Sequence, residues 1–175
     1  HALWTLDGLN VAERGHPEAY DHMTFALDHP APAVRRAAMQ ILSKTERGIK
    51  AMKKSKIWED EDPNAVLEAL LVISEWPADD EMGHTLFLMS EDPAVRDDHW
   101  LSQALYIASV THKNGFLKSY IRKNGSYDPQ EKEGEEEESS EWIRSFLDHY
   151  WDDSVRADEE EEVVFSGEAQ KIELG

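Results

Sequence analysis

Apolar residues recur along most of this chain at the spacing of amphipathic helices, and three prolines mark the clearest helix starts. Pro32, Pro63 and Pro93 each follow a turn that contains an aspartate, and each precedes an apolar stretch. Proline suits the first turn of a helix because its missing N–H would have no partner there. Pro63 comes 31 residues after Pro32, and Pro93 comes 30 residues after Pro63. A period in this range indicates a solenoid, whose units bury their apolar faces by stacking.

The same periodicity predicts the helices themselves. They are expected over residues 17–27, 32–42, 49–58, 63–76, 80–89 and 93–110, which pair in order into about three helical hairpins. Residues 1–9 resemble the second helix of a repeat, Gly48 is expected to weaken the start of the third helix, and a last helix is expected over 115–122. The fold predicted for residues 1–125 is therefore an all-α, right-handed solenoid.

The character of the chain changes after Gly125. Residues 126–140 contain four successive glutamates and few apolar residues, so we expect an acidic linker that acts as a mobile tether. Residues 141–157 are amphipathic, with Trp142 and Phe146 on one side, and predict an appended helix. Residues 158–175 begin with a second acidic run and are interpreted as the entry to a further domain.

The appended helix needs a surface on which to bury its apolar side. The last repeat offers one around Phe116, Leu117 and Ile121, because no further repeat is expected to cover it. We therefore expect the appended helix to dock there as a cap.

The charge of the chain restricts the classes of molecule that it is expected to bind. The formal net charge is −19, and residues 128–175 alone hold 18 acidic and 4 basic residues. Such a surface repels phosphate backbones and anionic membranes, so nucleic acid is excluded as a partner and proteins or neighbouring domains of the same polypeptide are favoured. No stretch has the length and apolar character of a membrane-spanning helix, so no membrane insertion is expected. The sequence does not indicate an oligomeric state.

The sequence contains few residues in patterns that indicate catalysis or metal binding. The chain has no cysteine, which removes disulfides, thiolate metal sites and cysteine nucleophiles. Asp80 with His84, and His149 with Asp153, stand four residues apart and could share a helix face, but each pair offers too few ligands for a zinc site. We expect surface pairing, no catalytic residue and no cofactor in this chain.

A weak candidate interaction surface remains. It consists of basic residues and one tryptophan: Arg35, Arg36, Arg96, Lys50, Lys53, Lys54 and Trp58. The arginines could line a groove for an acidic peptide, but we favour a ladder in which Arg35 and Arg96 pair with acidic residues on the next repeat's turn, such as Asp28, Asp62 or Asp92. The lysines could bind an acidic partner or the acidic tail, but we favour a solvated outer helix face.

The six tryptophans raise the possibility of a sugar-stacking platform. Trp4, Trp76 and Trp100 fall within apolar stripes and are expected in the core, whereas Trp58 borders an acidic run and is expected to be partly exposed. Trp142 and Trp151 belong to the appended helix, where packing against the end of the solenoid is their simplest role.

These blocks resemble a known repeat class. Residues 27–38, with Val34, Arg35 and Ala38, are similar to short bacterial HEAT-type repeats, and residues 88–96 repeat the pattern. The Trp-Leu-Gly-Tyr signature of tetratricopeptide repeats and the Thr-Pro-Leu-His signature of ankyrin repeats are absent. The resemblance implies a HEAT-like solenoid that acts as a scaffold or spacer and binds proteins.

A narrower resemblance concerns residues 1–9 and 98–108. They are similar to repeat openings in large bacterial secreted dehydrogenase-like proteins, in which a sugar-dehydrogenase-like propeller precedes HEAT repeats and a c-type cytochrome domain often follows. This resemblance implies a periplasmic or extracellular location, with the redox sites outside this chain. The leading hypothesis is a non-catalytic scaffold or spacer; the alternatives are this HEAT segment of an oxidoreductase and a HEAT-type chromophore lyase.

Overall fold

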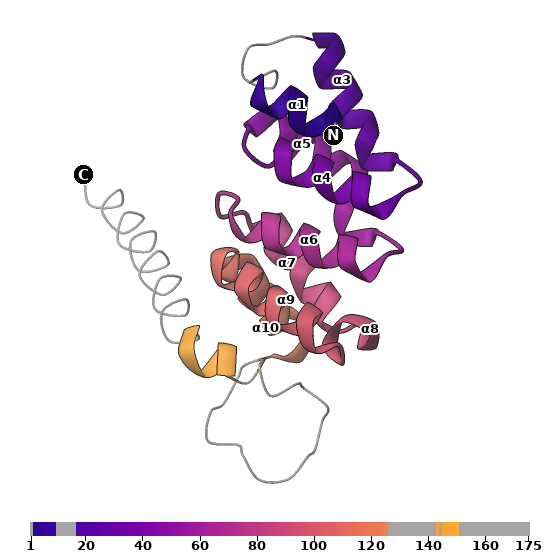
Figure 1. Cartoon of the computed structure of the whole chain (residues 1–175). Coiled ribbons are helices and arrows are strands. Elements are labelled where there is room, and N and C mark those ends of the chain that lie inside the picture. The colour runs from indigo at the N-terminus through magenta and orange to yellow at the C-terminus, as the bar shows by residue number, and fades with distance from the viewer. Residues whose placement is uncertain (1, 10–16, 126–142, 144, 151–175) are drawn as a thin grey trace, which may run out of the picture.

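The computed structural model describes residues 2–9, 17–125, 143 and 145–150, and these residues form helices, turns and loops with no strand among them (Figure 1). The prediction of an all-α fold is confirmed for this part of the chain. The α-helices are α1 (Ala2–Gly8), α3 (Pro17–Phe25), α4 (Pro32–Leu42), α5 (Glu46–Ser55), α6 (Pro63–Ser74), α7 (Asp80–Ser90), α8 (Pro93–Arg96), α9 (His99–Thr111) and α10 (Lys113–Asn124). Two short 3₁₀ helices, η1 (Ala26–Asp28) and η2 (Ile57–Glu59), precede α4 and α6. Within the described ranges, none of these helices combines the length and apolar character that crossing a membrane requires.

The three prolines occupy the first turn of their helices, as predicted. The Asp62 carboxylate caps α6 by accepting hydrogen bonds from the backbone N–H groups of Asn64 and Ala65, at 3.0 and 3.1 Å. Asp92 caps α8 in the same way through the N–H of Ala94, at 2.9 Å. An aspartate before a first-turn proline satisfies N–H groups that have no partner inside the helix. This local chemistry fixes where the helices start.

The single helix predicted over residues 93–110 is wrong in one respect. The chain forms the four-residue α8, turns at Asp97 and Asp98, and starts again as α9. The Asp98 carboxylate accepts hydrogen bonds from the N–H groups of Trp100 and Leu101, both at 2.9 Å, and so provides a second N-cap. A second cap within one apolar stretch explains the break.

The start of α5 also differs from the prediction. It begins at Glu46, capped by the Thr45 hydroxyl, which accepts a hydrogen bond from the N–H of Gly48. A Cβ atom at Gly48 would lie 1.9 Å from the carbonyl oxygen of Leu42. Gly48 therefore permits close contact between α5 and the end of α4, and does not weaken the helix start as expected.

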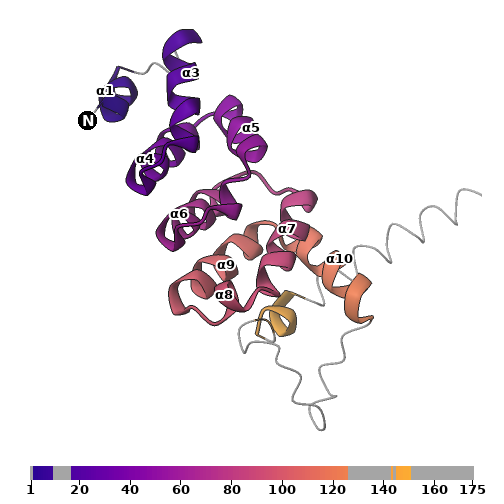
Figure 2. The ribbon, with the colours of Figure 1, turned by 90° about the vertical axis from the view of Figure 1, so that its right-hand side faces the viewer.

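The helices lie in two rows, which Figure 2 shows side by side. In one row α1 packs on α4, α4 on α6 and α6 on α9; this row is called the α4–α6–α9 row below. In the other row lie α3, α5, α7 and α10, with α3 contacting α5 and α7 contacting α10. Since the chain alternates between the rows, each pair of consecutive long helices spans both of them.

The core lies between the rows, and α6 stands at its centre. Seven of the 12 residues of α6 are buried, because it packs against α4 on one side and α9 on the other. Ala65, Ala69, Leu70 and Ile73 have no measurable exposure. The neighbouring helices α4 and α9 therefore bury the apolar stripe that α6 could not bury alone.

The described part of the appended helix, residues 143 and 145–150, packs on the end of the two rows (Figure 1). The ring of Phe146 is fully buried, with its centroid 4.9 Å from that of Phe116 and 5.9 Å from that of Tyr106. This contact confirms the expected docking near Phe116. Ile143 and Leu147 are the other buried residues of this helix, so its buried face differs from the expected stripe. Trp142, Trp151, the predicted linker and residues 158–175 lie outside the described residues.

Leu70→Ala tests the position of the core. Leu70 is fully buried in α6, so the substitution should lower the free energy of unfolding by about 2–5 kcal/mol through lost burial and a cavity. The neighbouring Leu71 is exposed, and Leu71→Ala should stay within about 0.5 kcal/mol of the parent protein. Urea denaturation followed by circular dichroism measures both values. Equal losses in the two variants would contradict the packing of α6.

Gly115→Ala tests the contact between α7 and α10. A Cβ atom at Gly115 would lie 2.1 Å from the backbone oxygen of Asp80, so the two helices would have to separate. We expect a loss of about 1–3 kcal/mol, the usual cost of overpacking. Gly8 has nothing within 4 Å of its Cβ position, so Gly8→Ala should leave stability unchanged or raise it. A thermal melt of Gly115→Ala that matches the parent protein would contradict this contact.

Candidate functional site

Arg35 is the best-defined member of the predicted interaction surface. Its guanidinium group donates to both carboxylate oxygens of Asp60, at 2.6 Å from Nε and 2.6 Å from Nη2. Its Nη1 also donates to the backbone oxygens of His29 and Pro30, at 2.8 and 3.3 Å. Arg35 thus ties the turn before α4 to the turn before α6. The expected pairing with the next repeat's turn occurs, although the partner is Asp60 and not one of the aspartates suggested by the sequence.

The electrostatics of Asp60 follow from this geometry. Burial by itself would raise the pKa of the Asp60 carboxyl. The hydrogen bonds from Arg35 and from the Asp62 N–H, together with the nearby guanidinium charge, outweigh burial and hold the pKa below its ordinary value of 3.8. Asp60 is therefore ionised at neutral pH and stabilises the folded state as a carboxylate.

Lys53 forms a second tie, from helix α5 to the start of α7. Its Nζ lies 2.5 Å from Oδ2 of Asp79, the N-cap residue of α7. Burial tends to raise the pKa of Asp79, but the hydrogen bonds from Lys53 and from the Met82 N–H outweigh it and lower the pKa. The expectation that Lys53 lies on a freely solvated helix face is therefore wrong, because its ammonium group is engaged in a structural ion pair.

The other members of the predicted surface do not join these two into one patch. Lys50 and Lys54 are exposed on α5, and Trp58 is partly buried against the core, as expected for it. Arg36 lies on α4, in the other row, with its Nη2 3.7 Å from Glu68. Arg96 donates from Nε to Asp97 in its own turn, at 2.9 Å. The seven residues thus lie on four elements, α4, α5, η2 and α8.

The Asp80 and His84 pair has structural partners. The Asp80 carboxylate accepts from Lys118 Nζ at 3.2 Å, and His84 Nδ1 lies 2.9 Å from the Ser119 hydroxyl. Both contacts join α7 to α10. Asp153, the partner suggested for His149, lies outside the described residues. Among the described residues, no group of three or more His, Asp and Glu side chains could hold a metal ion.

His112 is a buried histidine that the sequence analysis missed. Its Nδ1 accepts a hydrogen bond from the Asp79 N–H at 3.1 Å, so its Nε2–H donates to the Ile73 carbonyl oxygen at 3.0 Å. The ring therefore fastens the end of α9 to the loop between α6 and α7. No sequence pattern distinguishes a buried, hydrogen-bonded histidine after a helix end from an exposed histidine in the same place.

The tryptophans divide differently from the prediction. Trp76 is buried as expected, but Trp100 is 68% exposed and Trp4 is 50% exposed. Ile107 on α9 and Leu71 on α6 are also exposed, by 50% and 43%. These four side chains all belong to helices of the α4–α6–α9 row, which thus presents apolar surface to solvent.

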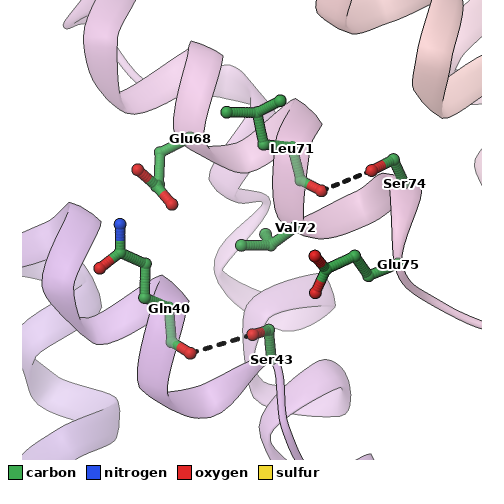
Figure 3. A pocket seen from close by; sticks show the side chains of 7 residues that line it. All are labelled: Gln40, Ser43, Glu68, Leu71, Val72, Ser74 and Glu75. Atoms are coloured by element: carbon green, nitrogen blue, oxygen red, sulfur yellow. Dashed lines mark hydrogen bonds between the residues drawn. The ribbon is translucent and has the colours of Figure 1, made fainter.

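A groove of about 370 Å³ lies between α4 and α6 in this row. Its lining residues are Gln40, Ser43, Glu68, Leu71, Val72, Ser74 and Glu75. Figure 3 shows Glu68 and Glu75 at opposite ends of the groove, with Gln40 and Ser43 of α4 across from them. The groove therefore combines an apolar wall with two carboxylates.

Comparisons of this chain with known protein families, with curated proteins and with solved structures return no match. The inference of function therefore depends on the geometry described above.

Asp60→Asn tests the tie between the turns and its pH dependence. Because the folded-state pKa of Asp60 is lowered, its contribution to stability is full above pH 3.8 and is lost as the pH falls through the lower, folded-state value. At pH 7 we expect Asp60→Asn to lower the free energy of unfolding by about 1–3 kcal/mol. The difference from the parent protein should shrink below about pH 4.

Denaturant titrations across this pH range measure the difference. Asp97→Asn is the matched control, because Asp97 also pairs with an arginine but is 65% exposed, and it should change stability by less than about 0.5 kcal/mol. A difference for Asp60→Asn that stays constant down to pH 2 would show that the charge of Asp60 is not responsible.

Proposed function

We propose that this chain is a non-catalytic α-solenoid module of the HEAT type, which serves as a scaffold or spacer and binds other proteins or neighbouring domains. Three consecutive helix pairs, α3 with α4, α5 with α6, and α7 with α9, support a repeating hairpin. The first-turn prolines of α4, α6 and α8 recur at a nearly constant spacing, which supports a common repeat unit. This function needs neither a cofactor nor a catalytic residue.

The end of the stack supports the same interpretation. In Figure 2 the helix of residues 145–150 continues the α4–α6–α9 row beyond α9, beside α10. The ring contacts of Phe146 with both Tyr106 of α9 and Phe116 of α10 agree with this position. The helix therefore covers the final apolar face, as a terminal unit of a solenoid must.

The observation that carries the proposal is the exposed apolar surface of the α4–α6–α9 row. Leu71 and Ile107 each lie eight residues after the first residue of their helix, so they occupy equivalent positions on neighbouring helices. Trp100 adds a large exposed aromatic side chain directly before Leu101, which is buried in the core. Large apolar side chains at equivalent positions along a row form a surface for contact with another polypeptide.

Site-specific photo-crosslinking tests this function. A photoreactive phenylalanine analogue at Ile107, in the protein expressed in its own cells, should crosslink reproducibly to one polypeptide or to a neighbouring domain. The same analogue at Leu88, an exposed leucine of α7 in the other row, is the matched control and should give no such product.

The variant Trp100→Ser should reduce the Ile107 crosslink while the circular dichroism spectrum is unchanged, because Trp100 is mostly exposed. Mass spectrometry of the crosslinked peptides identifies the contact. Equal crosslinking from Ile107 and Leu88, or none from Ile107, would contradict a binding role for this row.

A further inference from the structure

The groove between α4 and α6 contains a carboxylate that the protein leaves incompletely satisfied. The Glu68 side chain is 90% buried, since only 10% of it is exposed, and it points into the groove (Figure 3). The nearest basic group is Nη2 of Arg36, at 3.7 Å, which is longer than a hydrogen bond. Within the described part of the chain, the Glu68 carboxylate accepts no hydrogen bond. The Glu68 oxygens open onto the groove, so this group has unused capacity to accept donors there.

Arg36 does not supply the missing donors. Its side chain is 44% exposed, and its Nε is buried without a hydrogen-bond partner among the described residues. The ion pair with Glu68 is therefore a long contact made by one end of a partly solvated side chain. Such a pair stabilises weakly compared with a hydrogen-bonded one.

The rest of the groove is shaped for a long basic side chain. Leu71 and Val72 form an apolar wall between the two carboxylates, along which the methylene groups of an arginine can lie. Glu75 is exposed at the opposite end, two helical turns or about 10 Å along α6 from Glu68. Ser43 and Gln40 add polar groups on the α4 side.

We propose that this groove binds an extended, arginine-containing segment of a partner polypeptide. One guanidinium group donates hydrogen bonds to Glu68 and a second lies against Glu75, while the methylene groups of the two arginine side chains contact Leu71. The proposal rests on the proposed function and specifies the chemistry of the partner. An acidic peptide would place negative charge beside two carboxylates, and the net charge of −19 attracts basic segments over a longer range.

Nuclear magnetic resonance titration of the full chain tests the groove. The probe is the tripeptide Arg-Leu-Arg with blocked termini, and its control is the same peptide with both arginines replaced by citrulline, which has the same shape without the charge. The arginine peptide should give saturable shifts in the amide signals of groove residues such as Ser43, Leu71 and Ser74. The citrulline peptide should give none at the same concentration.

Three variants separate the groove from the general acidity of the chain. Glu68→Gln and Glu75→Gln should each weaken binding of the arginine peptide by about tenfold, the loss expected for one charge-assisted hydrogen bond. Glu81→Gln, an exposed glutamate on α7 in the other row, should bind as the parent protein does. Glu75 is exposed, so Glu75→Gln should leave the fold intact. It therefore tests binding in the groove even if Glu68→Gln unfolds the protein.

Shifts spread evenly over the acidic surface, or equal affinities for Glu75→Gln and Glu81→Gln, would overturn the proposal. Saturable binding of the citrulline peptide would overturn it as well. Crosslinking from Ile107 is measured independently of the groove. A protein that keeps this crosslink but does not bind the arginine peptide retains the proposed function and loses only the proposed partner chemistry.

Discussion

The packing of α6 between α4 and α9 is the contact on which the rest of the structure depends. Each of these helices carries an apolar stripe too wide to be covered by its hairpin partner alone, and lateral stacking buries the remainder. Since α6 touches a neighbour on both sides, its residues connect α4 to α9. The positions of the exposed side chains Leu71 and Ile107, and of the groove beside α4, all follow from the way in which this row stacks.

Charged side chains fix the alignment that the apolar contacts leave free. Apolar surfaces attract without strong direction, so two stacked helices can slide with little cost. The pair Arg35 with Asp60 joins α4 to the turn before α6, and the pair Lys53 with Asp79 joins α5 to the start of α7, both by directional, partly buried hydrogen bonds. The lowered pKa values of both aspartates show that the folded state favours their charged forms. The arginine and lysine of an otherwise acidic chain thus define the register between neighbouring repeats.

The sequence predicted the helices well because their starts depend on local chemistry. An aspartate N-cap directly before a proline fixes the start of α6, at Asp62 and Pro63, and the start of α8, at Asp92 and Pro93. Tertiary structure does not alter these starts. The break at Asp98 was missed because a strong apolar period hid a second N-cap. Trp100 was assigned to the core because it adjoins Leu101, yet neighbouring helical residues point about 100° apart.

The interaction surface could not be predicted in the same way. Arg35 and Lys53 are distinguished from Lys50 and Lys54 by acidic partners 25 and 26 residues further along the chain, and only the stacking brings these partners near. The groove has the same origin, since its walls come from two helices and its depth depends on their separation. Periodicity reports which side of one helix is apolar, but not the spacing between two helices.

Glycines allow a very close approach between two helices of one row, whereas a groove remains between two helices of the other row. Gly83 and Gly115 let the backbones of α7 and α10 meet where a Cβ atom would not fit, which closes that row. Between α4 and α6 the side chains that line the groove include Gln40 and Glu68, and these helices leave space between them. The surface that we propose for binding is therefore one where two neighbouring helices pack incompletely.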